Sequence, residues 1–246
     1  SAFTPTKITL EAFDDRRWEF VAPSTSSPLS AVISRDHFQL MFPSSGIWNY
    51  DSFIAAAASL PAFAPFGNTG DLTTRKREVA AFLANVAHET SQLTVLEEVT
   101  SNTYCSVRPY GCPAPEGYRG RGPLQLSHNY NYYAAGNFLG RDLLSSPTQV
   151  ATTPSIGWQA ALWFWMFEAG ASYGTAYEST AHASMTSNAA THGFLATIRA
   201  INGSLECGKP VDSLEHDQRN SRIEYYNDFV GYLGTTAGTM NNAACP

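Results

Sequence analysis

Apolar residues recur at helical spacing over most of the chain after residue 32, whereas the alternating pattern of strands is rare and short. This pattern predicts helices at residues 34–41, 50–60, 75–93, 153–166, 194–201 and 217–232. Stretches rich in proline and glycine predict loops at residues 61–74 and 99–122. We therefore expect a mainly α fold.

The first 31 residues differ from the rest of the chain. Residues 23–28 read Pro-Ser-Thr-Ser-Ser-Pro, which is typical of a linker. The segment before them, with Phe13, Trp18 and Phe20, is too short to fold alone. A chain of 246 residues suits one domain with a short appendage. We expect an N-terminal extension and linker at residues 1–31, followed by a single folded domain at residues 32–246.

The composition allows a sizeable core and argues against two classes of partner. Hydrophobic residues make up 43% of the chain and charged residues 15%, with a formal net charge of −6. A negative chain is poorly suited to bind nucleic acid or anionic lipid. No apolar run approaches the 18 residues of a transmembrane helix. The 13% of aromatic residues, beside many amides, is typical of a sugar-binding cleft, although a single ring more often packs in a core.

The four cysteines predict two disulfides. None of them forms a Cys-x-x-Cys pair, which argues against a zinc site. Of the three possible connectivities, we favour Cys105–Cys112 with Cys207–Cys245, because each pair closes a local or terminal segment. Disulfides form in oxidising compartments, so we expect a secreted, extracellular protein. The chain begins at Ser1 without a signal peptide, as a mature or trimmed protein would.

Glu89 is the first candidate for chemistry. In the predicted helix at residues 75–93, Val79, Phe82 and Val86 form an apolar stripe, and Glu89 falls on it. A carboxyl group on an apolar face is costly to ionise, so its pKa should be raised. A general acid needs a raised pKa. A buried carboxylate held by an arginine for structural reasons is the alternative.

The residues next to Glu89 argue against a metal site. His88-Glu89 begins like a zinc-protease motif, but Gln92 stands where the second histidine is required, so we predict neither metal nor cofactor. His88 itself is expected to be a packed, hydrogen-bonded core residue.

Glu98 would lie about 13 Å from Glu89 on a continuous helix, whereas inverting glycosidases place two carboxyl groups roughly 6.5–9.5 Å apart. The helix should therefore end near residues 91–93 and the chain should bend back, although spacing alone favours a solvated pair of glutamates.

Residues 118–132 form a run that suits sugar binding. They read Tyr-Arg-Gly-Arg-Gly-Pro-Leu-Gln-Leu-Ser-His-Asn-Tyr-Asn-Tyr. The run lacks the Gly-Lys-Ser/Thr of a phosphate loop. Its amides and tyrosines match the needs of neutral sugar hydroxyls and acetamido groups.

Together these motifs resemble glycoside hydrolase family 19, the chitinases of plants and some bacteria. The resemblance covers about residues 32–246 in the family's order, and it rests on His88-Glu89-Thr90, residues 118–132, Leu162-Trp-Phe-Trp-Met166, Ala200-Ile-Asn-Gly203, Ser221-Arg222-Ile-x-x-Tyr225, and Lys76-Arg-Glu78 with Ala81-Phe82. It implies a lysozyme-like, bilobal helical domain with a deep substrate cleft. The long loops of the larger plant enzymes are absent, which makes the chain similar to short-looped bacterial or class IV members.

The resemblance also implies a catalytic domain and the roles of its residues. Glu89 would be the general acid, and Glu98 the general base, because short-looped members place the base nine residues after the acid. Ser127 would help to hold the attacking water, and Arg222 would orient the carboxylates. The other expected substrate-binding residues are Thr90, Gln125, Tyr130, Asn131 and Asn202. The implied activity is endo-acting, inverting hydrolysis of chitin, a β-1,4-linked N-acetylglucosamine polymer, by a monomer.

The segment that carries Glu98 also carries Glu97. Adjacent side chains of an extended segment point to opposite sides, so both cannot face the cleft. We expect Glu97 to be solvated or paired with an arginine. The apolar neighbours Leu96 and Val99 should anchor the segment to the domain.

Two alternatives to a chitinase remain open. Related lysozyme-like domains cut peptidoglycan, and a protein of the same fold could bind chitin without cutting it. Loss of either glutamate would favour the inactive protein, but both are present. The chain also departs from the resemblance at Ser91-Gln92, where glycine is usual, and at Arg119, where tyrosine or phenylalanine is common.

Overall fold

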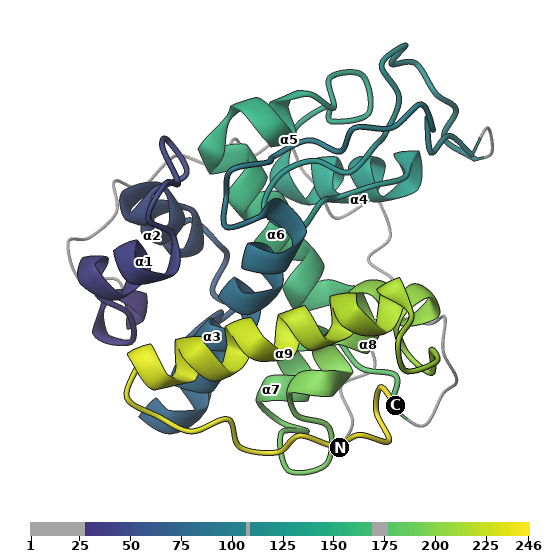
Figure 1. Cartoon of the computed structure of the whole chain (residues 1–246). Helices are drawn as coiled ribbons and strands as arrows, with labels where there is room; N and C mark the ends of the chain where they lie inside the picture. The colour runs from purple at the N-terminus through teal and green to yellow at the C-terminus, as the bar shows by residue number, and fades with distance from the viewer. Residues whose placement is uncertain (1–27, 107–108, 169–176) are drawn as a thin grey trace.

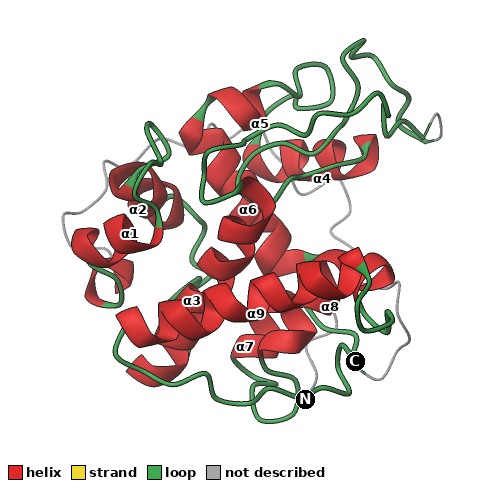
Figure 2. Ribbon diagram, viewed as in Figure 1, coloured by secondary structure: helices red, strands yellow, loops and turns green. Residues whose placement is uncertain are grey.

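The fold is helical throughout the part of the chain that the structure describes. The computed structural model describes residues 28–106, 109–168 and 177–246. Their helices are the 3-10 helix η2 (Pro28–Ala31) and the α-helices α1 (Arg35–Met41), α2 (Tyr50–Ala58), α3 (Leu72–Thr90), α4 (Asn129–Leu139), α5 (Gln149–Thr152), α6 (Pro154–Phe167), α7 (Ala181–Met185), α8 (Phe194–Glu206) and α9 (Leu214–Tyr232). In the same residues, β-pairing is limited to isolated bridges, and Figure 2 shows helices joined by loops. The predicted mainly α class is confirmed.

Each of the six predicted helices exists, with bounds that differ by a few residues. The third begins at Leu72, three residues early, because the side chain of Asp71 accepts a hydrogen bond from the Thr74 amide and caps its N-terminus. Three α-helices were not predicted, namely α4, α5 and α7, and the 3-10 helix η2 was not predicted either. The sequence of α4, Asn-Tyr-Asn-Tyr-Tyr-Ala-Ala-Gly-Asn-Phe-Leu, lacks a clear apolar stripe, and α5 and α7 are too short to show one.

The helices surround two hydrophobic cores. The larger core is built around α3, whose residues 78–87 are all buried, and Figure 1 shows α9 lying along it. Phe53, Phe82, Trp158 and Trp165 form its aromatic centre. The smaller core lies between α4, α6 and the loops around them. Figure 1 shows α4 and α5 in its upper part, α7, α8 and α9 in its lower part, and α6 between them. This arrangement agrees with the two-lobed fold that was expected.

The end of α3 bends the chain back as predicted. Ser91, Gln92 and Leu93 have φ angles of 47°, 59° and 65°, so three consecutive residues are left-handed. Each such residue other than glycine costs about 1 kcal/mol. The Thr90 hydroxyl stabilises the turn, since it donates to the Val86 carbonyl and accepts from the Leu93 amide. The side chain of Gln92 also donates to the Met41 carbonyl at 2.9 Å. The departure from glycine at Ser91-Gln92 thus falls on strained backbone.

The predicted extension lies mostly outside the described residues, which begin at residue 28. Leu29 is buried in the larger core together with Val32 and Ile33. Leu29, from the last part of the expected extension, therefore packs in the same core as the first residues of the expected domain. Among the described helices, none is long and apolar enough to cross a membrane.

Both predicted disulfides are present. Cys105 is bonded to Cys112, and Cys207 to Cys245. The second bond fastens the C-terminal segment to the end of α8, where the Gly208 amide also donates to the Pro246 carbonyl at 2.7 Å. The favoured connectivity is confirmed.

Candidate active site

Glu89 lies on the last turn of α3, where the predicted apolar stripe places it. Its side chain is only 18% exposed. Burial raises its pKa, and the nearby charges of Glu206 and Glu98 act in the same direction, while Arg222 opposes them without cancelling the effect. Glu89 is therefore harder to ionise than an exposed glutamate, as its position on an apolar face predicted.

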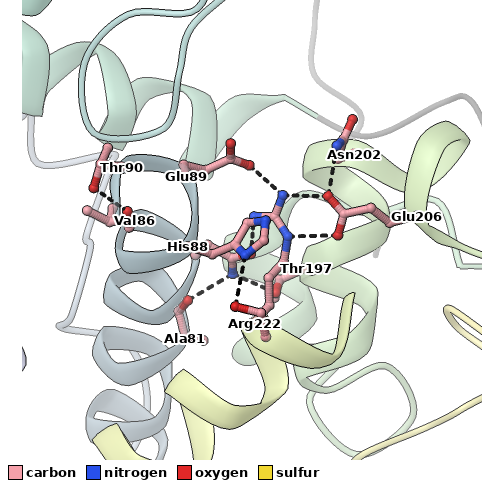
Figure 3. Close-up of polar contacts among 11 residues, drawn as sticks. Ala81, Val86, His88, Glu89, Thr90, Thr197, Asn202, Glu206 and Arg222 are labelled. Atoms are coloured by element: carbon pink, nitrogen blue, oxygen red, sulfur yellow. Dashed lines mark hydrogen bonds and ion pairs between the residues drawn. The ribbon is translucent and has the colours of Figure 1, made fainter. Parts of the chain in front are cut away.

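Arg222 of α9 links Glu89 to a second buried acid, Glu206 of α8. Its Nη2 atom donates to Glu89 Oε1 at 2.5 Å and to Glu206 Oε1 at 2.7 Å, and its Nε atom donates to Glu206 Oε2 at 2.8 Å (Figure 3). Burial alone would raise the pKa of Glu206, but the hydrogen bonds and charge of Arg222 hold it below its ordinary value. The negative charge of Glu206 thus balances the positive charge of the Arg222 guanidinium. Arg222 therefore does not cancel the rise that burial causes in the pKa of Glu89.

Two amide side chains fix this network. Asn85 of α3 accepts from Arg222 Nη1 at 3.1 Å and donates to Thr197 Oγ1 at 3.2 Å, which sets its orientation. Asn202 donates to Glu206 Oε1 at 2.8 Å. It has non-helical torsions (φ −144°, ψ 30°) at a kink within α8. The acid therefore sits in a rigid arrangement supplied by three helices.

Glu98 lies on the segment that the bend after α3 returns toward the site. Its Oε1 atom accepts from the Tyr104 hydroxyl at 2.8 Å, and its Oε2 atom accepts from the Gly120 amide at 3.0 Å. The Glu98 amide donates in turn to the Gly120 carbonyl at 2.8 Å. Two donors thus orient a half-buried carboxylate whose charge acts on Glu89. A carboxylate held in this way can accept a proton from water.

Glu97 pairs with arginine, one of the two settings expected for it. It pairs with the buried Arg121, whose Nε atom lies 3.1 Å from Glu97 Oε1, and with Arg119 at 3.5 Å. Arg119, the second departure from the resemblance, therefore neutralises Glu97.

The expected anchoring by apolar side chains is only half correct. Leu96 packs against the larger core, but Val99 is 98% exposed, so its predicted role as an anchor is wrong. Backbone hydrogen bonds hold the segment instead, from the Gly122 amide to the Leu96 carbonyl and between Glu98 and Gly120.

An aromatic row leads away from Glu98. Tyr104 contacts the His128 ring edge-to-face with centroids 5.0 Å apart, and His128 stacks on Tyr130 at 5.1 Å. Tyr130 is 41% exposed, so its ring is open to a ligand. Gln125, another residue predicted to bind substrate, is half-buried. Its side chain donates to the Gly122 carbonyl at 3.0 Å, beside the backbone that holds Glu98.

Ser127, Asn131 and Thr90 were also predicted to bind substrate, and they differ in their surroundings. Ser127 is half-buried, and its carbonyl accepts from Asn131 Nδ2 at 3.0 Å. Thr90 is fully buried, and its hydroxyl is engaged at the helix end. This side chain therefore holds the bend of the chain rather than facing solvent.

His88 behaves as the expected core residue. Its Nδ1 atom lies 3.2 Å from the Ser221 hydroxyl, and burial with the charge of Arg222 lowers its pKa to about 4. It is neutral near pH 7. Within the described ranges, no group of three or more His, Cys, Asp or Glu side chains is placed to hold a metal ion.

Sequence reasoning missed three residues of the site, namely Glu206, Tyr104 and His128. Glu206 follows Asn202 by four residues on α8, so helical spacing from a predicted contact was an available signal. Tyr104 lies in a loop and His128 directly before α4, so no helical or strand periodicity indicated that they belong to the site.

Comparisons with known proteins agree with the geometry. The sequence profile described as chitinase class I matches residues 32–245. An endochitinase of Phaseolus vulgaris is 38% identical over 88% of this chain and 71% of its own length. The crystal structure of chitinase C from Streptomyces griseus HUT6037 superposes with a TM-score of 0.74 at 39% identity, covering 88% of this chain and 98% of that one. An inactive chitinase-like protein of Hevea brasiliensis is also 38% identical, over 83% of this chain and 73% of its own length.

Proposed function

The chain belongs to the chitinase class I family, glycoside hydrolase family 19, and from that membership we propose that it cuts internal β-1,4 linkages of chitin with inversion at the anomeric carbon. The observation that supports this proposal most strongly is that two nearby carboxyl groups have different environments: burial raises the pKa of Glu89, whereas Glu98 accepts hydrogen bonds from Tyr104 and Gly120. Inverting hydrolysis needs one acid and one base in different environments.

Glu89 is the general acid of the proposed mechanism. It protonates the glycosidic oxygen as the bond to the anomeric carbon breaks. The resulting negative charge on Glu89 is stabilised by Arg222, which already donates to Oε1. Burial raises the pKa of this carboxyl group, which favours its role as a proton donor.

Glu98 is the general base. It removes a proton from the water that attacks the anomeric carbon from the opposite face. The Tyr104 hydroxyl and the Gly120 amide keep its two oxygens in place. Ser127 is proposed to help hold this water, while Gln125, Tyr130, Asn131 and Asn202 bind the sugar rings around the cleaved bond.

Peptidoglycan hydrolysis is the second candidate, since its polymer also contains β-1,4-linked N-acetylated sugars. The inactive relative makes a binding protein the third. The presence of both glutamates favours an enzyme. The two disulfides support the further proposal that the protein is secreted, and we propose that it acts as a monomer without a cofactor.

The test is product analysis on a chitin hexamer and on purified peptidoglycan, with Glu89→Gln as the matched variant. We expect the parent chain to cut the hexamer internally, and the variant to lose on the order of 10²-fold or more in turnover with unchanged circular dichroism. Soluble fragments from peptidoglycan alone would select the second candidate. Turnover by a folded Glu89→Gln protein would remove Glu89 from the mechanism.

A further inference from the structure

The exposed face of α4 carries aromatic and polar side chains in addition to those of the proposed catalytic pair, Glu89 and Glu98. Tyr130, Tyr133 and Asn137 follow one another at spacings of three and four residues, so they lie along one face of the helix. Tyr130 and Asn137 are exposed, and Tyr133 is half-buried. The aromatic row from Glu98 therefore continues past Tyr130 along the helix.

A second ring covers Tyr133. Tyr110 stacks on it with centroids 4.2 Å apart and an interplanar angle of 25°, although Tyr110 remains 39% exposed. A stacked pair at the surface presents a wide, flat and rigid aromatic area.

Residues on both sides of Tyr110 are joined to each other and to α4. Cys105 is bonded to Cys112. Asn129, buried at the first position of α4, donates to the carbonyls of Ser106 and Gly111 at 2.6 and 2.7 Å and accepts from the Ser106 amide at 3.1 Å. Tyr110 is thus held over Tyr133 by a covalent bond and a buried amide, which is more than an exposed ring pair needs for stability alone.

A hollow of about 460 Å³ lies next to the stacked pair, at the C-terminal end of α4. Tyr133 forms part of its wall, and its polar wall residues include Asn137, Arg141, Asp142 and Ser145. None of the residues around Glu89 and Glu98 lines it. A concave site with an aromatic wall and a few polar groups matches the chemistry of a sugar, whose C–H groups pack on a ring face while its hydroxyl and amide groups need hydrogen bonds.

We propose that Tyr133, Tyr110 and this hollow form a second carbohydrate-binding surface, which takes a distal part of the same β-1,4-linked N-acetylglucosamine chain that the catalytic site cuts. The choice of polymer rests on the proposed function. The surface is continuous with the aromatic row from Glu98, so one long chain can occupy both. Binding at two linked places raises the apparent affinity for a polymer without changing the affinity for a short oligomer.

Adsorption to insoluble chitin tests the surface directly. We compare Glu89→Gln, which is slow to cut its ligand, with the same protein carrying Tyr133→Ala or Tyr232→Ala. Tyr232 is a matched control, because it is 41% exposed and lies on α9. Tyr133→Ala should weaken adsorption by about tenfold, and Tyr232→Ala should leave it unchanged. Equal adsorption of the two variants would overturn the proposal, as would a preference of the Tyr133-dependent binding for peptidoglycan over chitin.

Kinetics of the otherwise unchanged chain separate this surface from the catalytic site. Tyr133→Ala should raise KM for long chitin and leave kcat, and the turnover of a short soluble oligomer, at parent levels. An equal loss on oligomer and polymer would mean that Tyr133 acts through the catalytic site or the fold, and would overturn the proposal. If the parent cuts no chitin oligomer, the proposed function fails. The adsorption comparison still decides whether the second surface exists.

Discussion

The charge of Glu206 raises the pKa of Glu89, the proposed general acid, and replacement of Glu206 by glutamine tests this effect. Glu206 accepts three hydrogen bonds of 2.7–2.8 Å, two from Arg222 and one from Asn202. Its negative charge raises the pKa of Glu89. In Glu206→Gln this charge is gone, while Arg222 still lowers the pKa of Glu89. The pKa of Glu89 should therefore fall.

The expected readout is a pH–rate profile. A general acid acts only while protonated, so the rate declines as the pH rises through its pKa. In Glu206→Gln this basic limb should move to lower pH. At a pH on the basic limb of the parent, kcat/KM should therefore fall, because a smaller fraction of Glu89 is protonated at that pH.

The same change should cost stability. The glutamine amide places an N–H group against the N–H donors of Arg222, so at least one charge-assisted hydrogen bond is lost. Breaking a buried ion pair from one side costs about 3–5 kcal/mol, which corresponds to a decrease in Tm of roughly 10 °C for a chain of this size. Differential scanning calorimetry measures this shift.

Glu78→Gln is the matched control. Glu78 is also fully buried, and its carboxylate accepts from Trp165 Nε1 at 3.2 Å and from the Gly67 amide at 3.1 Å. We expect this variant to lose stability without a shift of the basic limb. A folded Glu206→Gln protein that keeps the basic limb of the parent would refute the reasoning. An equal shift of the limb in Glu78→Gln would refute it as well.

Three further predictions concern the rest of the site and the fold. Glu98→Gln should lower kcat by on the order of 10²–10⁴-fold. Glu97→Gln should lower kcat less than about tenfold, because Glu97 pairs with arginines. The opposite ranking of the two variants in steady-state assays would assign the base to Glu97. Thr90→Val should lower the free energy of unfolding by about 1–3 kcal/mol, since the Leu93 amide loses its acceptor; an unchanged urea midpoint would contradict the role given to this hydroxyl. Thiol labelling of the denatured, unreduced protein should find no free cysteine, and four reactive thiols would argue against both disulfides and secretion.

Local patterns were sufficient to predict the buried position of Glu89 and the bend that follows it. An apolar stripe placed Glu89 in a buried position, and the spacing that two carboxyl groups require predicted that α3 ends near residue 91. The way the bend forms was not predictable. Three residues other than glycine adopt left-handed torsions there, and the side-chain hydrogen bonds of Thr90 and Gln92 help to hold them.

The ion pair between Glu206 and Arg222 could not be predicted from sequence patterns. Glu206 and Arg222 are 16 residues apart, on two helices that meet only in the folded chain. The error at Val99 has a related cause, because an apolar residue in an irregular segment carries no periodicity that tells which side is buried. The resemblance supplied Glu98 and Arg222, whereas physical reasoning alone left the pair of glutamates open to a solvated interpretation.

The anomeric form of the first products tests the central claim most directly. Proton NMR of a chitin hexamer digest within the first minutes, before mutarotation, reads the configuration at the new reducing end. If Glu89 protonates the leaving oxygen while Glu98 activates water on the opposite face, the new reducing ends must appear as the α-anomer. Initial accumulation of the β-anomer would contradict the inverting mechanism and the role assigned to Glu98.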